Sequence, residues 1–441
     1  MNKKTLLFTV ALLFAGNSMA QAQGSNDDNE ISVTDSKGNQ EVIEFPEAMG
    51  YELDSLMNLY MAKTYLDEDE DCQMKDINPV FEKEVYIDRL SRIPSIIEMP
   101  YNDVVQKFID RYSGRLRHSV SYMLGASNFY MPIFEEALEA YELPLELRYM
   151  PVIESALNPT AVSRAGATGL WQFMLPTGKR YGLNVNSLVD ERRDPIKSSY
   201  AAAQYLSDLY KVFGDWTLVI AAYNCGPEQV NKAIRRSNGE RDYWKIYPYL
   251  PKETRGYVPA FIAANYIMTY YCDHNICPMK TRLPAKTDTL MLSKNVHLEQ
   301  IAAVCGVSID ELRALNPAYR RDVIPGATEL SCLRLPQTEV GKFIDNEDSI
   351  YNYKSEELMA KRTEVEVNKQ AASTTSSKRS ATRRKSRTRA RYVTIRSGQT
   401  LSELAEKHGT TVSRLKRLNG LKGTSIRAGK KLRVRDRKSV V

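Results

Sequence analysis

One glutamate stands where a charged side chain is costly. In "VIESALNP" (152–159) it ends an apolar stretch. Leu147, Met150 and Glu154 follow the i, i+3, i+7 spacing of one helix face. An ionised carboxylate on such a face is unfavourable unless it is paired, hydrogen-bonded or protonated. Glu154 therefore needs an explanation, and the pattern alone leaves two open: a functional carboxyl, or a solvated residue at a helix end.

Three further segments carry side chains that suit a sugar-binding cleft. They are "AGATGLWQFM" (165–174), "AAYNCGP" (221–227) and "ETRGYVP" (253–259). Their aromatic faces suit packing on a sugar ring, their amides suit hydroxyl and acetamido groups, and their glycines suit a tight loop. The residues are Trp171, Phe173, Tyr223, Gln172, Asn224, Gly166 and Gly169. Read singly, each segment is equally a core turn, a helix end or a cap. Apart from Glu253, Glu154 is the only acid in these segments.

The elements that must position these segments are helical. From about Tyr101 to Tyr271 the apolar spacing predicts an all-α domain of roughly 170 residues. Helices are expected over 102–124, 131–141, 198–214 and 216–224, with joints at Pro144, Gly182, Gly214 and Pro248.

The C-terminal part contains an internal repeat. Residues 289–317 predict a strand, a helix, a stop at Gly306 and a second helix, and 323–336 supply a closing strand. Residues 391–434 have the same layout, with a capping box from Thr400 to Glu403. Residues 371–391, between the two copies, lack acids and large apolar groups, which is typical of a solvated linker.

The N-terminus is expected to direct export. Lys3 and Lys4, a short apolar run and a small-x-small site predict a signal peptide over 1–20, with a membrane anchor as the alternative. The first cysteine is Cys72, so no lipoprotein acylation is expected. In an oxidising compartment the six cysteines can pair, locally as 272 with 277 and 305 with 332, or remain buried thiols. No Cys/His cluster has zinc-ligand spacing, so no metal is expected.

The charge is divided unevenly along the chain. From Lys378 to the C-terminus 21 Lys and Arg face 3 acids, a net +18. The whole chain carries +7, so residues 1–377 carry −11. The basic end suits an anionic envelope polymer or membrane surface, and the export signal argues against nucleic acid.

The last copy resembles the LysM family, a module that binds glycans containing N-acetylglucosamine. The likeness covers 391–435, through "SGQTL", "RLNGL" and "IRAGKKL", with Gln399 where an acidic residue is usual. It implies a β-α-α-β fold and a glycan groove lined by Gly398, Gln399, Thr400, Leu401, Asn419, Leu421 and Ile426. The copy at 289–336 lacks the "SGxTL" loop, so we expect a LysM-like module that does not bind.

The four central segments together resemble the lytic transglycosylases of glycoside hydrolase family twenty-three, which have a goose-lysozyme-like fold. The family motifs correspond to Glu154-Ser155, Gly169-Leu170-Trp171-Gln172 and Ala222-Tyr223-Asn224. "DERRDP" (190–195) and "PKETRGYVP" (251–259) narrow the likeness to the membrane-bound lytic murein transglycosylase D branch. Trp171 and Cys225 depart from the usual residues without removing a group that the chemistry needs.

The resemblance implies a mostly α fold with small LysM modules. The expected divisions are a signal peptide (1–20), an acidic, partly disordered lead-in (21–95), a catalytic domain (96–280), a degenerate LysM-like module (285–338), a helical then basic disordered linker (339–390) and a LysM domain (391–435).

The resemblance also implies an activity. The enzyme would cleave the β-1,4 bond between N-acetylmuramic acid and N-acetylglucosamine and leave a 1,6-anhydro end, with peptidoglycan strands as partner and no cofactor. Glu154 would act as acid and then base, with sugar-binding residues Ser155, Gly169, Gln172, Tyr223, Asn224 and Tyr257. The expected location is the periplasm or cell envelope, without a transmembrane segment in the mature chain. Two other function classes fit: a decayed wall-binding scaffold, and a muramidase that uses water.

Overall fold

The structure is a computed structural model of the chain. It describes residues 30–34, 40–46, 49, 66–67, 69, 71–74, 77–281, 283–284, 286–359, 391–395, 399–408, 411–421, 423 and 429–435. The expected signal peptide and the basic stretch 360–390 lie outside these residues. The chain divides into two compact units, Met1–Val367 and Asn368–Val441.

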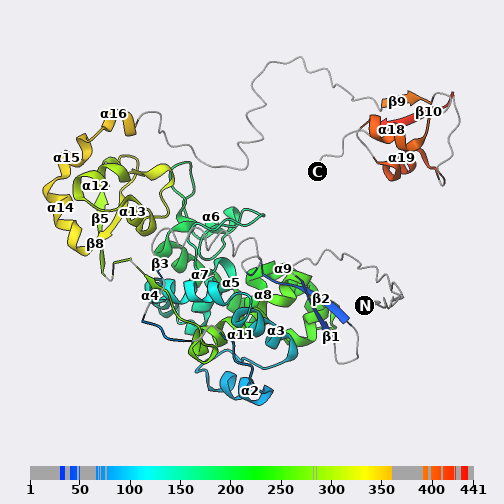
Figure 1. Cartoon of the computed structure of the whole chain (residues 1–441), viewed down its shortest axis with the longest axis horizontal. Helices are drawn as coiled ribbons and strands as arrows, with labels where there is room; N and C mark the ends of the chain where they lie inside the picture. The colour runs from blue at the N-terminus through cyan, green and yellow to red at the C-terminus, as the bar shows by residue number, and fades with distance from the viewer. Residues whose placement is uncertain are drawn as a thin grey trace, which may run out of the picture. The chain divides into compact units, whose positions relative to one another are not determined.

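The first unit has a helical part and a smaller mixed part (Figure 1). The helices of the helical part are α2 (Lys83–Arg92), α3 (Asp103–Ser113), α4 (Arg117–Glu139), α5 (Met150–Ser155), α6 (Leu175–Arg180), α7 (Pro195–Phe213), α8 (Trp216–Cys225), α9 (Pro227–Arg236), α10 (Tyr243–Ile246) and α11 (Lys252–Tyr270). No helix in the described part of the chain is long and apolar enough to cross a membrane.

The helix expected over 102–124 is interrupted. The helix α3 ends at Ser113, and α4 begins at Arg117 and continues to Glu139, through the segment expected as a separate helix. A side chain at Gly114 would place its Cβ 2.8 Å from the carbonyl oxygen of Asp110. Glycine therefore allows a turn here that apolar spacing alone does not show.

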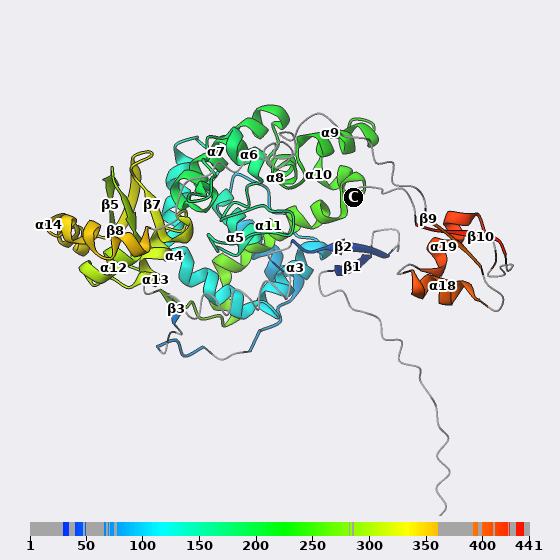
Figure 2. The ribbon, with the colours of Figure 1, turned by 90° about the horizontal axis from the view of Figure 1, so that it is seen from above.

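The helix α11 forms the centre of the helical part. It packs on α3, α5 and α8, and its residues from Gly256 to Met268 are buried. Strand β2 (Gln40–Glu44) pairs with β1 (Glu30–Thr34) and also lies against α11 (Figure 2). Buried Phe45 packs edge-on against Phe108 of α3. Part of the expected acidic lead-in thus contributes to the core.

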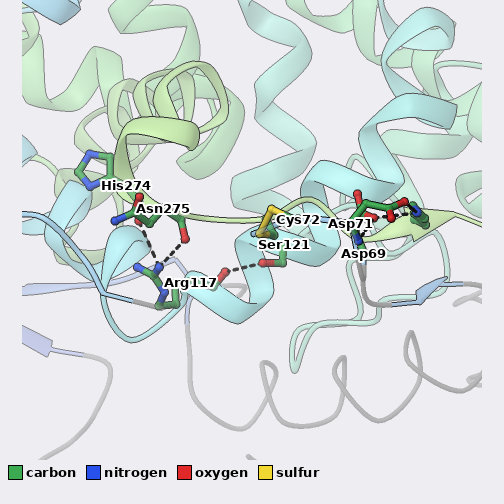
Figure 3. The surroundings of a disulfide bond; sticks show 9 residues. Asp69, Asp71, Cys72, Arg117, Ser121, His274 and Asn275 are labelled. Atoms are coloured by element: carbon green, nitrogen blue, oxygen red, sulfur yellow. Dashed lines mark hydrogen bonds and ion pairs between the residues drawn. A yellow bond between two sulfur atoms is a disulfide. The ribbon is translucent and has the colours of Figure 1, made fainter. Parts of the chain in front are cut away.

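A disulfide joins Cys72 to Cys277, with a Cα separation of 6.0 Å (Figure 3). Strand β3 (Leu66–Asp67) pairs antiparallel with β4 (Lys280–Thr281), which brings the two cysteines together. The expected pairing of Cys272 with Cys277 is wrong, because this strand pairing directs Cys277 to the N-terminal segment and leaves Cys272 an exposed free thiol.

The mixed part is the LysM-like module. Its elements are β5 (Thr287–Leu292), β6 (Asn295–His297), α12 (Leu298–Cys305), α13 (Ile309–Leu315), β7 (Val323–Pro325) and β8 (Ser331–Pro336), followed by α14 (Val340–Asp345), α15 (Glu347–Asn352) and α16 (Ser355–Leu358). The stop at Gly306 is left-handed, with φ +73°.

The local pairing of Cys305 with Cys332, which lies within this module, is also wrong, and Cys305 is a buried thiol, as in the alternative. Cys305 is buried in the module core, whereas Cys332 lies beside Leu333, and neighbouring residues of a strand point to opposite faces. Leu333 is the one that packs in the core, so Cys332 points away from Cys305.

The second unit contains β9 (Arg391–Thr394), α18 (Leu401–Lys407), α19 (Val412–Asn419) and β10 (Lys431–Arg435). The expected capping box is present: Thr400 Oγ1 accepts from Glu403 N at 3.3 Å, and Thr400 N donates to Glu403 Oε2 at 3.2 Å. Leu401, Leu404 and Leu415 form the core.

The two modules share a further bond pattern. Asn419 donates to the carbonyl oxygens of Leu415 and Arg433 and accepts from Arg433 N at 2.8 Å. In the first module Asn316 donates to the carbonyl oxygens of Leu312 and Arg334 and accepts from Arg334 N at 2.8 Å. The side-chain amide therefore ties the second helix to the closing strand in both copies, which supports the internal repeat.

Candidate active site

A cleft of about 440 Å³ opens on the helical part where all four sequence segments meet. Its lining is contributed by α5, the loop after α5, α6, α7, α8, the start of α11 and the segment after β2. The residues are Pro46, Ile153, Glu154, Ser163, Ala165, Ala167, Gln172, Phe173, Met174, Thr177, Tyr205, Tyr223, Asn224, Cys225, Gly226, Glu253 and Tyr257.

Glu154 lies at the end of the short helix α5 and borders this cleft. The helix stops there because Ala156 adopts a left-handed conformation, with φ +47°. The residues before Glu154 are buried core residues, among them Ile153. Removal from water raises the pKa of Glu154 to about 8, so its carboxyl is protonated at neutral pH. A protonated carboxyl beside an open cleft is the arrangement that a general acid requires.

Two neighbours adjust this pKa in opposite directions. The buried hydroxyl of Tyr257 donates to Glu154 Oε1, which stabilises the carboxylate and lowers the pKa. The negative charge of Glu253 disfavours a second carboxylate and raises it. Glu253 and Tyr257 are four residues apart on α11, so both lie on one helix face toward the cleft.

The loop 161–173 forms one wall of the cleft and carries Gln172 and Phe173. Gln172 Nε2 donates to the carbonyl oxygens of Gly169 at 2.8 Å and Ala161 at 3.3 Å, so this amide nitrogen holds the loop. Gly169 is buried, with φ +88°, and a Cβ there would lie 1.8 Å from the carbonyl oxygen of Arg192. Gly169 therefore allows close backbone packing and does not line the cleft.

Two residues expected near the sugar are buried behind the site. Ser155 has no exposed surface, and its hydroxyl donates to the carbonyl oxygens of Pro151 and Leu170 at 3.1 and 2.9 Å. The expected sugar-facing role of Trp171 is wrong, because its ring is 1% exposed and its Nε1 donates to Ser199 Oγ at 2.9 Å. Both residues hold the site together from inside.

The helix α8 presents Tyr223, Asn224 and Cys225 to the cleft. The hydroxyl of Tyr223 donates to the carbonyl oxygen of Trp171 at 2.8 Å, which joins α8 to the loop. Asn224 Oδ1 accepts from Thr254 Oγ1 at 2.8 Å, which joins α8 to α11. Burial raises the pKa of Tyr223 well above its usual range, so this side chain is a neutral donor.

The LysM residues fall into three groups. Gly398 and Ile426 lie outside the described residues. Leu401 is buried in the module core, and Asn419 binds backbone groups, so neither is shown as a sugar contact. Gln399, Thr400 and Leu421 remain at least partly exposed.

Sequence reasoning missed two parts of the cleft. Tyr205 of α7 packs on Tyr223 with a ring-centroid distance of 5.3 Å, and Pro46 arrives from the N-terminal segment. Glu253 lies four residues before Tyr257, and this spacing places both on one face of a helix. The sequence could therefore have indicated Glu253 as a second acid at the site. Nothing in the local sequence points to Pro46. In the described part of the chain no group of three or more His, Cys, Asp and Glu residues has a geometry that could hold a metal ion.

Three family descriptions match the chain. Residues 131–246 match the transglycosylase SLT domain. Residues 286–352 match the LysM-like domain of lytic transglycosylase MltD, and residues 393–435 match the LysM domain. The matches follow the helical part and the two modules in order.

Relatives with known names agree with these matches. The membrane-bound lytic murein transglycosylase D of Escherichia coli (strain K12) is 28% identical over 345 residues, which cover 76% of this chain and 70% of the relative. The soluble lytic murein transglycosylase of the same strain is 33% identical over 124 residues, covering 27% of this chain and 19% of the relative.

Solved structures are similar over a shorter part. The 70 kDa soluble lytic transglycosylase from Escherichia coli shares 30% identity, with a TM-score of 0.29, over 33% of this chain and 25% of that one. The lytic transglycosylase Slt from Pseudomonas aeruginosa shares 23% identity, with the same TM-score and the same coverage. The family matches and the relative that spans most of the chain agree: this chain combines an SLT domain with an MltD-type LysM-like domain and a LysM domain, and over most of its length it is similar to a membrane-bound lytic murein transglycosylase.

Proposed function

We propose that this chain cleaves the β-1,4 bond between N-acetylmuramic acid and N-acetylglucosamine in peptidoglycan and leaves a 1,6-anhydro-N-acetylmuramic acid end. The observation that supports this most directly is Glu154, a carboxyl with a pKa of about 8 bordering an open cleft with aromatic and amide side chains. The activity serves remodelling and turnover of the cell wall, and export by residues 1–20 to the periplasm or envelope belongs to the same proposal.

The proposed reaction uses one carboxyl twice. Glu154 first gives its proton to the oxygen of the leaving sugar, while the 2-acetamido oxygen of the muramic acid stabilises the positive charge at C1. The carboxylate then removes the proton of the 6-hydroxyl, whose oxygen bonds to C1 and closes the anhydro ring. Glu154 ends the cycle protonated, and no water is consumed.

Neighbouring residues support the two protonation states in turn. Apolar surroundings keep the proton on Glu154 at rest, and the Tyr257 hydroxyl donates to the carboxylate after the proton has left. Phe173, Tyr223 and Asn224 line the cleft, where they are proposed to hold the sugar. Ser155 and Gly169 are proposed to act from behind, by fixing the loop.

Glu253 gives a specific reason to consider hydrolysis as the second candidate. Hydrolases of the common kind use a second carboxylate as base or nucleophile, and Glu253 borders the same cleft. The products distinguish the two reactions, because a 1,6-anhydro end is lighter than a hydrolysed end by one water.

The test is mass spectrometry of peptidoglycan digested by the wild type, Glu154→Gln and Glu253→Gln. We expect anhydro ends from the wild type and from Glu253→Gln. We expect the rate of cleavage to be about 10²- to 10⁴-fold lower in Glu154→Gln, because this is the usual contribution of a general acid. Substantial turnover by a folded Glu154→Gln protein would contradict the assignment. Hydrated ends that disappear in Glu253→Gln would establish the hydrolase instead.

A further inference from the structure

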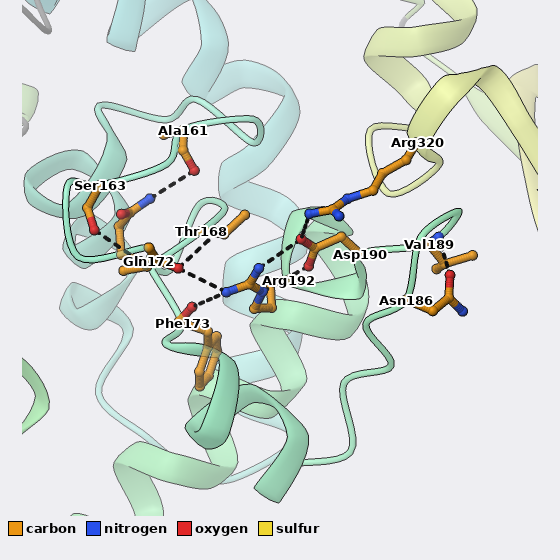
Figure 4. Close-up of polar contacts among 12 residues, drawn as sticks. Ala161, Ser163, Thr168, Gln172, Phe173, Asn186, Val189, Asp190, Arg192 and Arg320 are labelled. Carbon is orange, nitrogen blue, oxygen red and sulfur yellow. Dashed lines mark hydrogen bonds and ion pairs between the residues drawn. The ribbon is translucent and has the colours of Figure 1, made fainter. Parts of the chain in front are cut away.

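Asp190, a fully buried carboxylate, connects the LysM-like module to the wall of the cleft (Figure 4). Arg192 Nε and Nη2 donate to its two oxygens at 2.9 Å each. Arg320 of the LysM-like module donates to Oδ2 from the other side at 2.8 Å. Asp190 therefore has one partner in the helical part and one in the module.

The same Arg192 holds the cleft loop. Its Nη1 donates to the carbonyl oxygens of Gly166 and Phe173, both at 3.1 Å, so it ties the two sides of the loop that carries Gln172. Its own backbone lies against Gly169. A displacement of the Arg192 guanidinium would therefore weaken its bonds to the loop that carries Gln172 and Phe173, two residues of the cleft.

The module is attached at this point by backbone bonds as well. Asp190 N donates to the carbonyl oxygen of Ala318 at 2.9 Å, and Arg320 N donates to that of Leu188 at 2.6 Å. Val189 and Tyr319 form a β-bridge between these bonds. Residues 318–320 of the module are thus paired with residues 188–190 of the helical part.

The attachment involves a segment of the first module whose counterpart in the second module is predicted to border the glycan groove. The shared bond pattern aligns Asn316 with Asn419, and hence Ala318 with Leu421. Resemblance places Leu421 beside a glycan groove, whereas Ala318 is 5% exposed and lies in the junction. The equivalent segment of the first module is already covered by the protein itself.

We propose that the LysM-like module is a brace for the catalytic cleft and not a glycan-binding module, and that Arg320 is a positioning residue for the reaction. Arg320 acts through Asp190 and Arg192 on the loop 166–173. The inference rests on the proposed function for its kinetic consequence only, because the loop geometry exists independently of turnover.

The variant Arg320→Ala tests this without leaving an isolated buried charge, because Asp190 keeps its two bonds to Arg192. The matched control is Arg313→Ala: Arg313 belongs to the same module and binds Asp310 and Asp322 within it. Arg320→Lys retains the charge and loses the planar fork. All three are made in the full-length chain.

The first measurement is hydrogen exchange of the amides in 161–175, which are held by bonds such as Gly169 N to Ala161 O at 2.9 Å. We expect exchange roughly threefold to tenfold faster in Arg320→Ala, partial recovery in Arg320→Lys and no change in Arg313→Ala. The second is the kcat for soluble peptidoglycan fragments, expected to fall by a similar factor in Arg320→Ala.

The brace would be overturned if the amides of 161–175 exchanged in Arg320→Ala at the wild-type rate. It would also be overturned if their exchange were accelerated equally in Arg313→Ala. Faster exchange in Arg320→Ala accompanied by unchanged kcat in an active preparation would overturn it as well. A wild-type protein without activity would instead contradict the proposed function, and the exchange result would still decide the brace. If Arg320→Ala unfolds, the exchange of the loop in Arg320→Lys, measured against Arg313→Ala, decides in its place.

Discussion

The proton on Glu154 sets the pH range in which the enzyme is expected to act. Since the acid form starts the reaction, activity should fall as pH rises through about 8, the pKa that burial gives this carboxyl. Tyr257→Phe removes the bond that lowers this pKa, so the alkaline limb should move to higher pH. Glu253→Gln removes a charge that raises it, so the limb should move to lower pH.

The measurement is the pH profile of kcat/KM on soluble fragments for the wild type and both variants. The two opposite shifts serve as controls for each other, because general damage to the cleft would lower activity without moving the limbs apart. Shifts of the same sign would contradict the assigned acid.

The same proton links stability to pH. The pKa of Glu154 rises from 4.5 to about 8 on folding, so the native state binds more protons than the unfolded state between these values. The stabilisation due to this carboxyl is complete below about pH 4.5 and is lost as pH rises through about 8. The free energy of unfolding of the wild type minus that of Glu154→Gln should therefore decrease across this window in urea titrations. A constant difference would show that the pKa is not raised.

At the scale of elements, the glycines of the cleft loop differ in what they allow. Gly166 and Gly169 both have positive φ, +86° and +88°, but a Cβ at Gly166 meets open space and one at Gly169 meets the carbonyl of Arg192. Gly166→Ala should cost about 1–2 kcal/mol of backbone strain. Gly169→Ala should cost more and lower kcat as well, because the loop must move. Equal effects in denaturation and kinetic assays would contradict this difference.

The Cys72–Cys277 disulfide holds the N-terminal segment around β3 against the end of the helical part. The Cys72–Cys277 bond closes a separation of 205 residues, and its removal should lower the free energy of unfolding by about 2–4 kcal/mol. The double variant Cys72→Ser, Cys277→Ser tests this in denaturant, and Cys272→Ser is the control because that thiol is free and exposed. Stability unchanged by the double variant, or by reductant on the wild type, would contradict the prediction.

The periodic helices and the segments of the cleft could be predicted from the sequence. Features that depend on contacts between residues distant along the chain could not. Spacing predicted α7, α8 and the helices of both modules, and four short motifs predicted the group around Glu154. It failed for Trp171, since an aromatic residue has the same appearance in a cleft and in a core. It also failed for Cys72, because disulfide partners are set by strand pairing across the whole fold.

At the scale of the whole molecule, the second unit is expected to concentrate the enzyme on its substrate. Residues from Lys378 onward carry a net +18, and the LysM module follows the basic stretch. A tethered module raises the local concentration of the catalytic unit without changing its chemistry. Deletion of 372–441 should therefore weaken peptidoglycan pull-down more than it slows cleavage of soluble fragments.

A linker variant separates the two contributions to pull-down. Replacing the Lys and Arg residues of 378–390 by Gln keeps the module and removes the basic charge of the linker. Binding through the linker charge should weaken with added salt, so pull-down of this variant should depend less on salt than pull-down of the wild type. Equal pull-down by the truncated and complete chains would contradict the tether.

The Cys72–Cys277 bond has a consequence for damage by proteases. The segment it encloses includes the whole SLT match, 131–246, and the residues of the cleft from Glu154 to Tyr257. A single cut of the backbone within that segment yields two pieces that stay joined through sulfur. A nicked molecule can therefore keep its cleft assembled, and its pieces should separate on a gel only after reduction.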